Sequence, residues 1–284
     1  MSGDGLLGAA DIRALASKLN VNPTKQWGQN FVIDANTVRS IIKISGVDET
    51  DNVVEVGPGL GSLTLGLVAL CATTTAIEID PVLAAQIPMT IAERLPQFAD
   101  RFHVVAQDAL TVQELPVVPT ALVSNLPYNV SVPVLIHMLS TFPTINSALV
   151  MVQAEVADRL AAVPGSKIYG VPSVKARWFG EVKKAATIGR NVFWPAPNVD
   201  SALVSLRRHD QPLAEVSQAE LFGCIDAAFS QRRKMLRGAL AQWAGSSAQA
   251  EAIIRAAGID PTVRGEQLDV QDFIAITQAR TAHG

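Results

Sequence analysis

Short apolar runs alternate with helical patterns through the middle of the chain, and this alternation constrains the fold more than any other feature. The strand-like runs lie at residues 52–56, 75–79, 102–106, 121–124 and 148–152, and two more follow at 183–188 and 201–206. Helical patterns at 63–71 and 131–139, and a helix opened by Asp80-Pro81, separate the earlier runs. Because parallel strands need such crossovers, the order predicts an α/β fold with a seven-stranded, mostly parallel, doubly wound sheet.

Helical patterns flank this region on both sides. Residues 11–19 carry apolar residues at helical spacing, and a second helix begins after the N-cap residue Asp34 and stops at Gly46. After about residue 211 the strand signals end, and helical patterns remain at 217–229, 232–243, 248–257 and 269–280. We therefore expect one domain of residues 1–210, with an N-terminal helical segment at 11–46, and a small all-helical domain of residues 211–284.

Composition excludes several classes of protein. The 284 residues are 49% hydrophobic and 17% charged, which is enough to bury a sizeable core. Cys71 and Cys224 lie far apart and suggest no disulfide framework, and the four histidines show no metal-ligand spacing, so we expect no metal. The N-terminus lacks a secretory pattern, and no apolar stretch is long enough to span a bilayer. These features predict a soluble protein of the cytoplasm.

Charge is distributed unevenly, although the net charge is only −3. Residues 48–120 hold ten acidic and two basic residues, whereas residues 167–240 hold twelve basic and six acidic residues. This asymmetry is typical of a surface that binds a polyanion, and a solvated helix face is the alternative explanation. The candidate residues for contacts to RNA phosphates are Lys175, Arg177, Lys183, Lys184, Arg190, Arg232, Arg233, Lys234 and Arg237.

The segment EVGPGLG at 55–61 joins a strand to a helix, as nucleotide-binding turns do. Gly57 and Gly59 would let the backbone approach a ligand that a Cβ atom would block, although a tight structural turn is an alternative. Glu78 ends the next strand, where an acid can bind ribose hydroxyls, and Asp108 follows the third strand, where it could accept from an adenine amino group. Each of these two acids has an alternative role as a helix N-cap.

The clustered acids discriminate between cofactors. A pyrophosphate would be repelled by them, and the sequence has no P-loop lysine to offset the repulsion. S-adenosylmethionine carries a sulfonium cation and no phosphate, so we favour it over NAD. We assign Ile79 and Ala109, the neighbours of the two acids, to the same site. Gln29, Asn30 and Val32 lie in a loop that could donate to the carboxylate of the cofactor, or could serve only as a helix entry.

The segment NLPYN at 125–129 follows the fourth strand, at the sheet edge where open α/β proteins place their chemistry. The Asn125 side-chain oxygen and the Leu126 carbonyl, whose direction Pro127 restricts, could accept the two protons of an exocyclic amine. Tyr128 offers a face for stacking a base. The pattern predicts in-line methyl transfer to a flat amino base, and a polar turn at the end of a strand is the alternative.

With these motifs in place, the chain resembles the bacterial small-subunit rRNA adenine N6,N6-dimethyltransferases over about residues 23–280. The resemblance is carried by GQNF (28–31), EVGPGLG (55–61), NLPYN (125–129), FWPAPNVDS (193–201), FSQRRKMLRGAL (229–240) and GIDPTVRGEQL (258–268). It implies a Rossmann-like, S-adenosylmethionine-dependent methyltransferase domain with a helical C-terminal domain that binds rRNA. It also implies dimethylation of two adjacent adenosines in the 3′-terminal hairpin loop of small-subunit rRNA during ribosome assembly. We expect the partner to be small-subunit rRNA or a pre-30S particle, and the protein to be a monomer.

The same resemblance implies roles for individual residues. Asn30, Val32, Gly57, Glu78, Asp108 and Asn125 would line the cofactor site, and Phe193 would be a second aromatic that sandwiches the flipped adenine against Tyr128. Three alternatives remain: the related large-subunit rRNA methyltransferase of the macrolide-resistance type, which is usually strongly basic; a ribosome-assembly factor whose activity is incidental; and, more distantly, a dehydrogenase that binds NAD.

Overall fold

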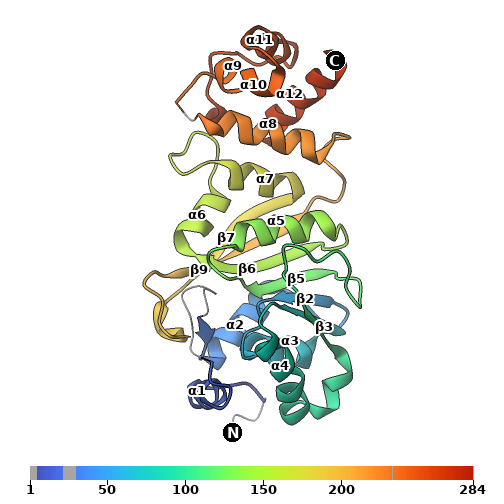
Figure 1. Cartoon of the computed structure of the whole chain (residues 1–284), viewed down its shortest axis with the longest axis vertical. Helices are drawn as coiled ribbons and strands as arrows, with labels where there is room; N and C mark the ends of the chain where they lie inside the picture. The colour runs from blue at the N-terminus through green and yellow to red at the C-terminus, as the bar shows by residue number, and fades with distance from the viewer. Residues whose placement is uncertain (1–4, 22–29, 232, 284) are drawn as a thin grey trace. The chain divides into compact units, whose positions relative to one another are not determined.

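The computed structural model of the chain describes residues 5–21, 30–231 and 233–283. The chain divides into two compact units, one of residues 1–157 and 183–208 and one of residues 158–182 and 209–284. Each unit has its own hydrophobic core. Figure 1 shows the order of the elements along the chain.

The expected seven-stranded sheet is confirmed in the first unit. Its strand order is β4-β3-β2-β5-β6-β9-β7, and the neighbours from β4 to β6 pair in parallel whereas β9 runs antiparallel to β6. The strands are β2 (Asn52–Val56), β3 (Thr73–Glu78), β4 (Phe102–Ala106), β5 (Ala121–Asn125), β6 (Ser147–Gln153), β7 (Gly180–Ile188) and β9 (Ser201–Arg208). Because β2 to β5 are parallel, their carboxyl ends meet at one edge of the sheet.

A second, two-stranded sheet was not predicted from the sequence. It pairs β1 (Phe31–Val32) with β8 (Phe193–Trp194) in antiparallel register, with Val32 opposite Phe193. Two residues are too few to give a recognisable strand pattern, so only the folded chain reveals this pairing.

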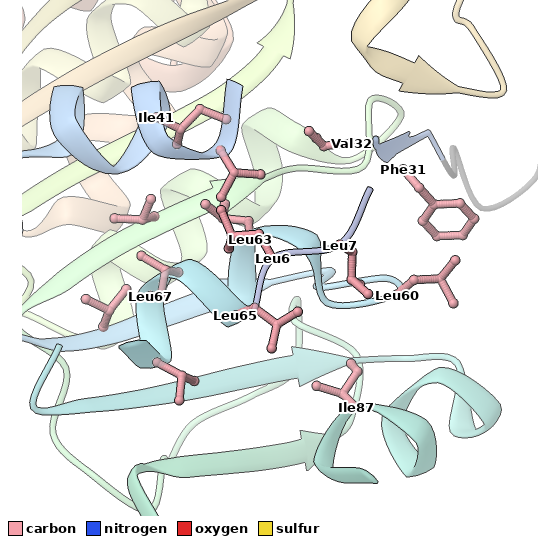
Figure 2. Close-up of a cluster of buried hydrophobic side chains, with 14 of the residues drawn as sticks. Leu6, Leu7, Phe31, Val32, Ile41, Leu60, Leu63, Leu65, Leu67 and Ile87 are labelled. Atoms are coloured by element: carbon pink, nitrogen blue, oxygen red, sulfur yellow. The ribbon is translucent and has the colours of Figure 1, made fainter. Parts of the chain in front are cut away.

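Helices cover the sheet of the first unit and bury a core of aliphatic side chains. They are α1 (Ala9–Lys18), α2 (Ala35–Ser45), α3 (Ser62–Leu70), α4 (Pro81–Arg94) and α5 (Ser131–Thr141), with the 3-10 helices η2 (Pro96–Arg101) and η3 (Arg190–Val192). The helix α6 (Ala154–Ala161) begins in the first unit, and its residues from 158 onward belong to the second. The predicted caps are confirmed: the Asp34 carboxylate accepts from the Thr37 N–H, and Gly46 ends α2 in the left-handed conformation. Figure 2 shows Leu63, Leu65 and Leu67 of α3 and Ile41 of α2 among the side chains of this core.

The second unit is helical, but it is larger than the expected domain of residues 211–284. Its helices are α7 (Val171–Phe179), α8 (Gln218–Ser230), α9 (Leu236–Ala239), α10 (Ala241–Ala244), α11 (Ser247–Ala256) and α12 (Val270–His283), with the 3-10 helix η4 (Gly265–Gln267). Residues 158–182 belong to it because α7 packs against α8 and α12, and the buried Tyr169 donates to the Leu268 carbonyl at 2.9 Å. The sequence carries no linker signal that would separate this segment from the first unit.

The single helix expected at 232–243 is wrong. The first helical residue is Leu236, and the segment forms two short helices, α9 and α10. The Leu236 and Arg237 N–H groups donate to the carbonyls of Val263 and Pro261 at 2.7 and 3.2 Å. In a helix that began at residue 232, these two N–H groups would donate to carbonyls four residues earlier. Here they donate to a distant segment instead, so tertiary hydrogen bonds override the local helix propensity. Among the described helices, none combines the length and apolar character needed to cross a membrane.

Candidate active site

A cavity of about 290 Å³ lies at the carboxyl edge of the parallel strands in the first unit. It is bounded by the segment before α2, the ends of β2 and β3, the start of α3, and the turns that follow β4 and β5. The predicted residues that line it are Asn30, Val32, Gly57, Gly59, Glu78, Ile79, Asp108, Ala109, Asn125, Leu126, Pro127 and Tyr128. Gln29 lies outside the described residues. Residues from four strand ends thus meet at one hollow, as parallel topology requires.

The glycine turn brings other side chains together as well as leaving room for a ligand. Gly57 and Gly59 have φ angles of +69° and +59°, which favour glycine. A Cβ atom at Gly59 would lie 2.8 Å from two ring carbons of Phe31, and one at Gly57 would lie 3.4 Å from Pro127. Figure 2 shows Phe31 at the end of β1 beside Leu60. The turn therefore lets Phe31 form part of the cavity wall.

Glu78 is held in place by two backbone donors. Its side chain is buried, and its carboxylate oxygens accept from the Gly59 N–H at 3.3 Å and from the Asp80 N–H at 3.0 Å. The helix N-cap suggested as an alternative role belongs to Asp80, which accepts from Val82 and Leu83 at the start of α4. Burial raises the pKa of Glu78, and its two backbone donors oppose the shift.

Asp108 lines the cavity and also fixes its own turn. Its carboxylate accepts from the Leu110 N–H at 2.9 Å. In the described structure this turn does not continue into a helix, so Asp108 caps a turn, as Asp residues commonly do. The side chain of Leu110 joins it in the cavity lining.

Asn125 lines the cavity and carries an acceptor without a partner. Its side-chain N–H group donates to the Asn30 carbonyl at 3.1 Å, while its Oδ1 atom is buried and has no hydrogen-bond partner. Because one end of the amide is anchored, the orientation of the other end is fixed. Buried polar atoms are normally hydrogen-bonded, so Oδ1 is an acceptor that lacks its donor. The sequence predicted Asn125 but not its anchor on Asn30.

The rest of the tetrapeptide is held by backbone and side-chain contacts. Leu126 is buried, and its N–H donates to the Met151 carbonyl at 3.1 Å, which fixes the peptide between β5 and β6. The Tyr128 hydroxyl lies 2.6 Å from the Ser201 hydroxyl at the start of β9. Burial raises the pKa of Tyr128, so the phenol stays neutral. Pro127 and Tyr128 both face the cavity.

The role that the resemblance implies for Phe193 stays a prediction. This side chain is 3% exposed and packs in the hydrophobic core of the first unit, and it does not line the described cavity. Pairing of β8 with β1 places it opposite Val32. Its neighbour Trp194 stacks on Phe31, with 6.3 Å between ring centroids and an interplanar angle of 25°. The aromatic side chains on the cavity wall are Tyr128 and Phe31.

Glu55 is the first residue of the segment EVGPGLG, and the sequence alone indicates no role for it. It is 1% exposed, lines the cavity, and has a buried Oε2 atom without a partner. Burial raises the pKa of its carboxyl to about 8; the Thr64 hydroxyl opposes the shift and the nearby Glu78 carboxylate adds to it. An acid inside an otherwise apolar strand, two residues before a glycine turn, is the signal that could have identified it.

The predicted basic residues divide into two groups. Arg177 is half-buried and donates to the carbonyls of Leu160, Ser173 and Ala161, so it stabilises the second unit rather than facing a polyanion. Lys175 forms an ion pair with Asp226 at 2.8 Å. Arg190 and Arg237 also pair with acids but stay about half exposed. The remaining described candidates, Lys183, Lys184, Arg233 and Lys234, are exposed, and Arg232 lies outside the described residues.

The sheet order and the position of the cavity are those of Rossmann-like methyltransferases, and solved structures share the fold. A dimethyladenosine transferase from Plasmodium falciparum matches with a TM-score of 0.73 and 22% identity, over 86% of this chain and 94% of its own. The 23S rRNA methyltransferase ErmE matches with a TM-score of 0.65 and 25% identity, over 89% of this chain and 100% of its own.

Residues 20–281 match the family described as ribosomal RNA adenine dimethylase, and the chain belongs to that family. Its relatives include the ribosomal RNA small subunit methyltransferase A of Streptomyces coelicolor, which is 64% identical over 97% of both chains. The protein of the same name from Paenarthrobacter aurescens is 57% identical, over 97% of this chain and 94% of its own. The predicted family and its enzymatic class, methyltransferase, are thereby confirmed.

Proposed function

We propose that the protein dimethylates the N6 atoms of two adjacent adenosines in the 3′-terminal hairpin loop of small-subunit rRNA during ribosome biogenesis, with S-adenosylmethionine as methyl donor. One observation carries this proposal: Asn125 lines the cavity, and its Oδ1 atom is buried without a hydrogen-bond partner while its amide N–H group is anchored on the Asn30 carbonyl. An exocyclic amine would supply the missing hydrogen bond.

The cavity fits a cationic cofactor better than a phosphate-bearing one. Three of its lining residues carry carboxyl groups, namely Glu55, Glu78 and Asp108, and no lysine, arginine or histidine is found among its described lining residues. Acidic walls favour a cation and repel a pyrophosphate, which argues against the NAD-binding alternative. Glu78 would bind ribose hydroxyls, and Asp108, Ile79 and Ala109 would contact the adenine.

When bound, the cofactor supplies a methyl group on a sulfonium cation. Asn125 Oδ1 and the Leu126 carbonyl would accept the two amine protons and turn the nitrogen lone pair out of conjugation with the ring. Tyr128 would stack on the base, which must leave its neighbours in the RNA to reach the cavity. Positioning supplies most of the rate enhancement. No strong base is required, because the methylated amine is cationic and loses its proton readily.

The small-subunit target is supported by the relatives. The curated proteins that are 64% and 57% identical are named as small-subunit enzymes, whereas the likeness to ErmE, a large-subunit enzyme, has 25% identity. A pure assembly factor would have no use for an amide that is anchored on one side and unpartnered on the other. This observation favours the enzyme over the binding protein.

We further propose that the second unit and the adjoining basic residues bind the rRNA of a pre-30S particle, in the cytoplasm and as a monomer. The exposed residues Lys183, Lys184, Arg233 and Lys234 are the best-placed candidates, together with Arg190 and Arg237. Phosphate contacts of this kind give steep salt dependence. The proposed RNA-binding domain is thus residues 158–182 and 209–284 rather than 211–284 alone.

The test uses small-subunit particles from cells that lack this gene, the purified protein and S-adenosylmethionine with a labelled methyl group. Mass spectrometry should find two adjacent adenosines that each gain two methyl groups. The variant Asn125→Ala should transfer no methyl groups yet bind the cofactor. Methylation of large-subunit precursors only, or unchanged turnover by Asn125→Ala, would contradict the proposal.

A further inference from the structure

Glu55 is the one carboxyl group in the cavity wall that the proposed mechanism leaves unused. It lies on β2, is 1% exposed, and its Oε2 atom is buried without a hydrogen-bond partner. An ionised carboxylate in such a place is costly unless a cation or a donor compensates it. Among the described residues no hydrogen bond to Oε2 is found and no cationic side chain lines the cavity; the Thr64 hydroxyl on α3 lowers the pKa of the carboxyl but does not offset its burial.

The groups around Glu55 keep it neutral in the protein alone. The neighbouring strand β3 presents Glu78, the turn after β4 presents Asp108, and the segment after β5 presents the neutral phenol of Tyr128. The helix α3 carries no charged residue in its sequence. Burial, with the Glu78 carboxylate adding to it, raises the pKa of Glu55 to about 8, so the carboxyl holds its proton at neutral pH.

We infer that Glu55 releases its proton to solvent when a cationic ligand enters the cavity, and that the resulting carboxylate is the ligand's counter-charge. The inference rests on the proposed function, in which S-adenosylmethionine is this ligand. The proton leaves the carboxyl and is taken up by buffer, and the positive charge of the ligand replaces it. No covalent bond to the ligand forms or breaks.

This exchange makes the cavity selective for charge. A neutral ligand of the same shape cannot compensate the carboxylate, so Glu55 keeps its proton and contributes no ionic attraction. A cationic ligand must displace the proton, and its affinity should therefore increase with pH up to the pKa of Glu55. Two cationic groups of the cofactor could pair with the Glu55 carboxylate, the sulfonium and the α-ammonium group. Analogues of the cofactor that lack one or both of these groups distinguish between them.

The experiment is isothermal titration calorimetry of the full chain near pH 7 in two buffers of different ionisation enthalpy, which counts the protons exchanged. The wild type should release roughly one proton more than Glu55→Gln when S-adenosylmethionine binds. Its apparent Kd should be at least about tenfold larger near pH 6 than near pH 8.5, whereas that of Glu55→Gln should change far less. Glu93→Gln, at an exposed position on α4 outside the cavity, should match the wild type.

Two further ligands identify the cation. S-adenosylhomocysteine keeps the ammonium group and lacks the sulfonium, and 5′-methylthioadenosine lacks both. Proton release with S-adenosylmethionine and S-adenosylhomocysteine, but not with 5′-methylthioadenosine, assigns the ammonium group. Release with S-adenosylmethionine alone assigns the sulfonium. Either result supports the inference. Equal release with all three ligands would overturn it, because the neutral ligand would then displace the proton too.

Failure of the inference can be separated from failure of the proposed function. Binding of S-adenosylmethionine with the same proton count in the wild type and in Glu55→Gln overturns the inference and leaves the cofactor in place. No binding at any pH overturns both. If Glu55→Gln does not fold, infrared difference spectra of the wild type decide: loss of a neutral carboxyl band on binding supports the inference, and an unchanged band contradicts it.

Discussion

The hydroxyl groups of Tyr128 and Ser201 lie 2.6 Å apart, which joins the segment after β5 to the first residue of β9. Ser201 is fully buried, so its hydroxyl has little freedom to find another partner. The contact fixes the tilt of the Tyr128 ring, which is the surface on which we propose that the target base stacks. Ser201 is therefore a positioning residue that acts through Tyr128.

Ser201→Ala should lower kcat about fivefold, because a net hydrogen bond of about 1 kcal/mol holds the ring. The cofactor Kd should not change, since Ser201 does not line the cavity. The measurement is single-turnover methylation at saturating rRNA. Ser205→Ala, on the same strand and half-buried, is the matched control and should keep the wild-type rate.

A double-mutant cycle tests whether the two hydroxyls act together. Tyr128→Phe keeps the ring and removes the same hydrogen bond, so the double variant with Ser201→Ala should be no slower than either single variant. Additive losses would show that the two side chains act independently and would contradict the positioning role.

Gly59→Ala should weaken cofactor binding and destabilise the first unit. The φ angle of +59° costs a non-glycine residue about 1–2 kcal/mol, and the new methyl group would lie 2.8 Å from the Phe31 ring. Thermal unfolding and cofactor titration measure the two effects. Gly189→Ala is the control, because Gly189 has φ −70° and open space at its Cβ position. A Gly59→Ala variant with wild-type stability and affinity would contradict this account.

The sheet was predictable from the sequence because its strands carry apolar runs, and those of the central strands β2, β5 and β6 are buried. The ranges expected for β2 and β4 agree with the structure to the residue, and Asn125, Glu78 and Asp108 were predicted because parallel strands end at one edge. The helix expected at 232–243 failed because its first donors bond to residues 261 and 263. Contacts between distant segments of this kind leave no local pattern.

The same limit applies inside the candidate site. Asn30 anchors Asn125 and Ser201 anchors Tyr128 across 95 and 73 residues of sequence, and neither partner could be chosen without coordinates. The pairing of Phe193 with Val32 could not be predicted either, because it belongs to the two-residue strand β8. Glu55 was passed over because an acid within a strand is ambiguous until its burial is known.

The stability of the protein without cofactor should fall as pH rises from about 4.5 to about 8. The native carboxyl of Glu55 has a raised pKa, so in this window the native state binds more protons than the unfolded state, and the free energy of unfolding decreases with pH. The stabilising effect is complete below the unfolded pKa and is lost as pH rises through the native pKa. Glu78, whose pKa is also raised, acts in the same direction.

Thermal unfolding against pH measures this effect. Glu55→Gln should flatten the decrease, because the amide does not titrate, and should unfold at a higher temperature than the wild type near pH 8. If the two proteins showed the same dependence on pH, Glu55 would not be the group that holds the proton. Saturating S-adenosylmethionine should also flatten the wild-type curve, since the cation compensates the carboxylate.

Arg177→Ala should destabilise the second unit without a specific effect on RNA binding. The variant leaves the carbonyls of Leu160, Ala161 and Ser173 without their donor, and we expect a loss of about 1–3 kcal/mol in the free energy of unfolding. Denaturant unfolding gives this value. The dependence of RNA affinity on salt, measured below the unfolding temperature, should match the wild type. A shallower salt dependence would return Arg177 to the phosphate-binding residues.

Arg233 and Lys234 should show the opposite behaviour. Both side chains are exposed in the turn between α8 and α9, so replacing both with glutamine should leave the free energy of unfolding within about 0.5 kcal/mol of the wild-type value. Each phosphate contact that is lost should reduce the slope of log K against log salt concentration by roughly 0.7–0.9. Titration of labelled small-subunit rRNA at several salt concentrations measures the slope. Lys43→Gln, at an exposed position on α2 in the first unit, controls for the loss of net charge, because a general effect of charge would give this single variant about half the change of the double variant. An unchanged slope for the Arg233 and Lys234 variant would show that these residues form a solvated surface, and that the RNA is held elsewhere.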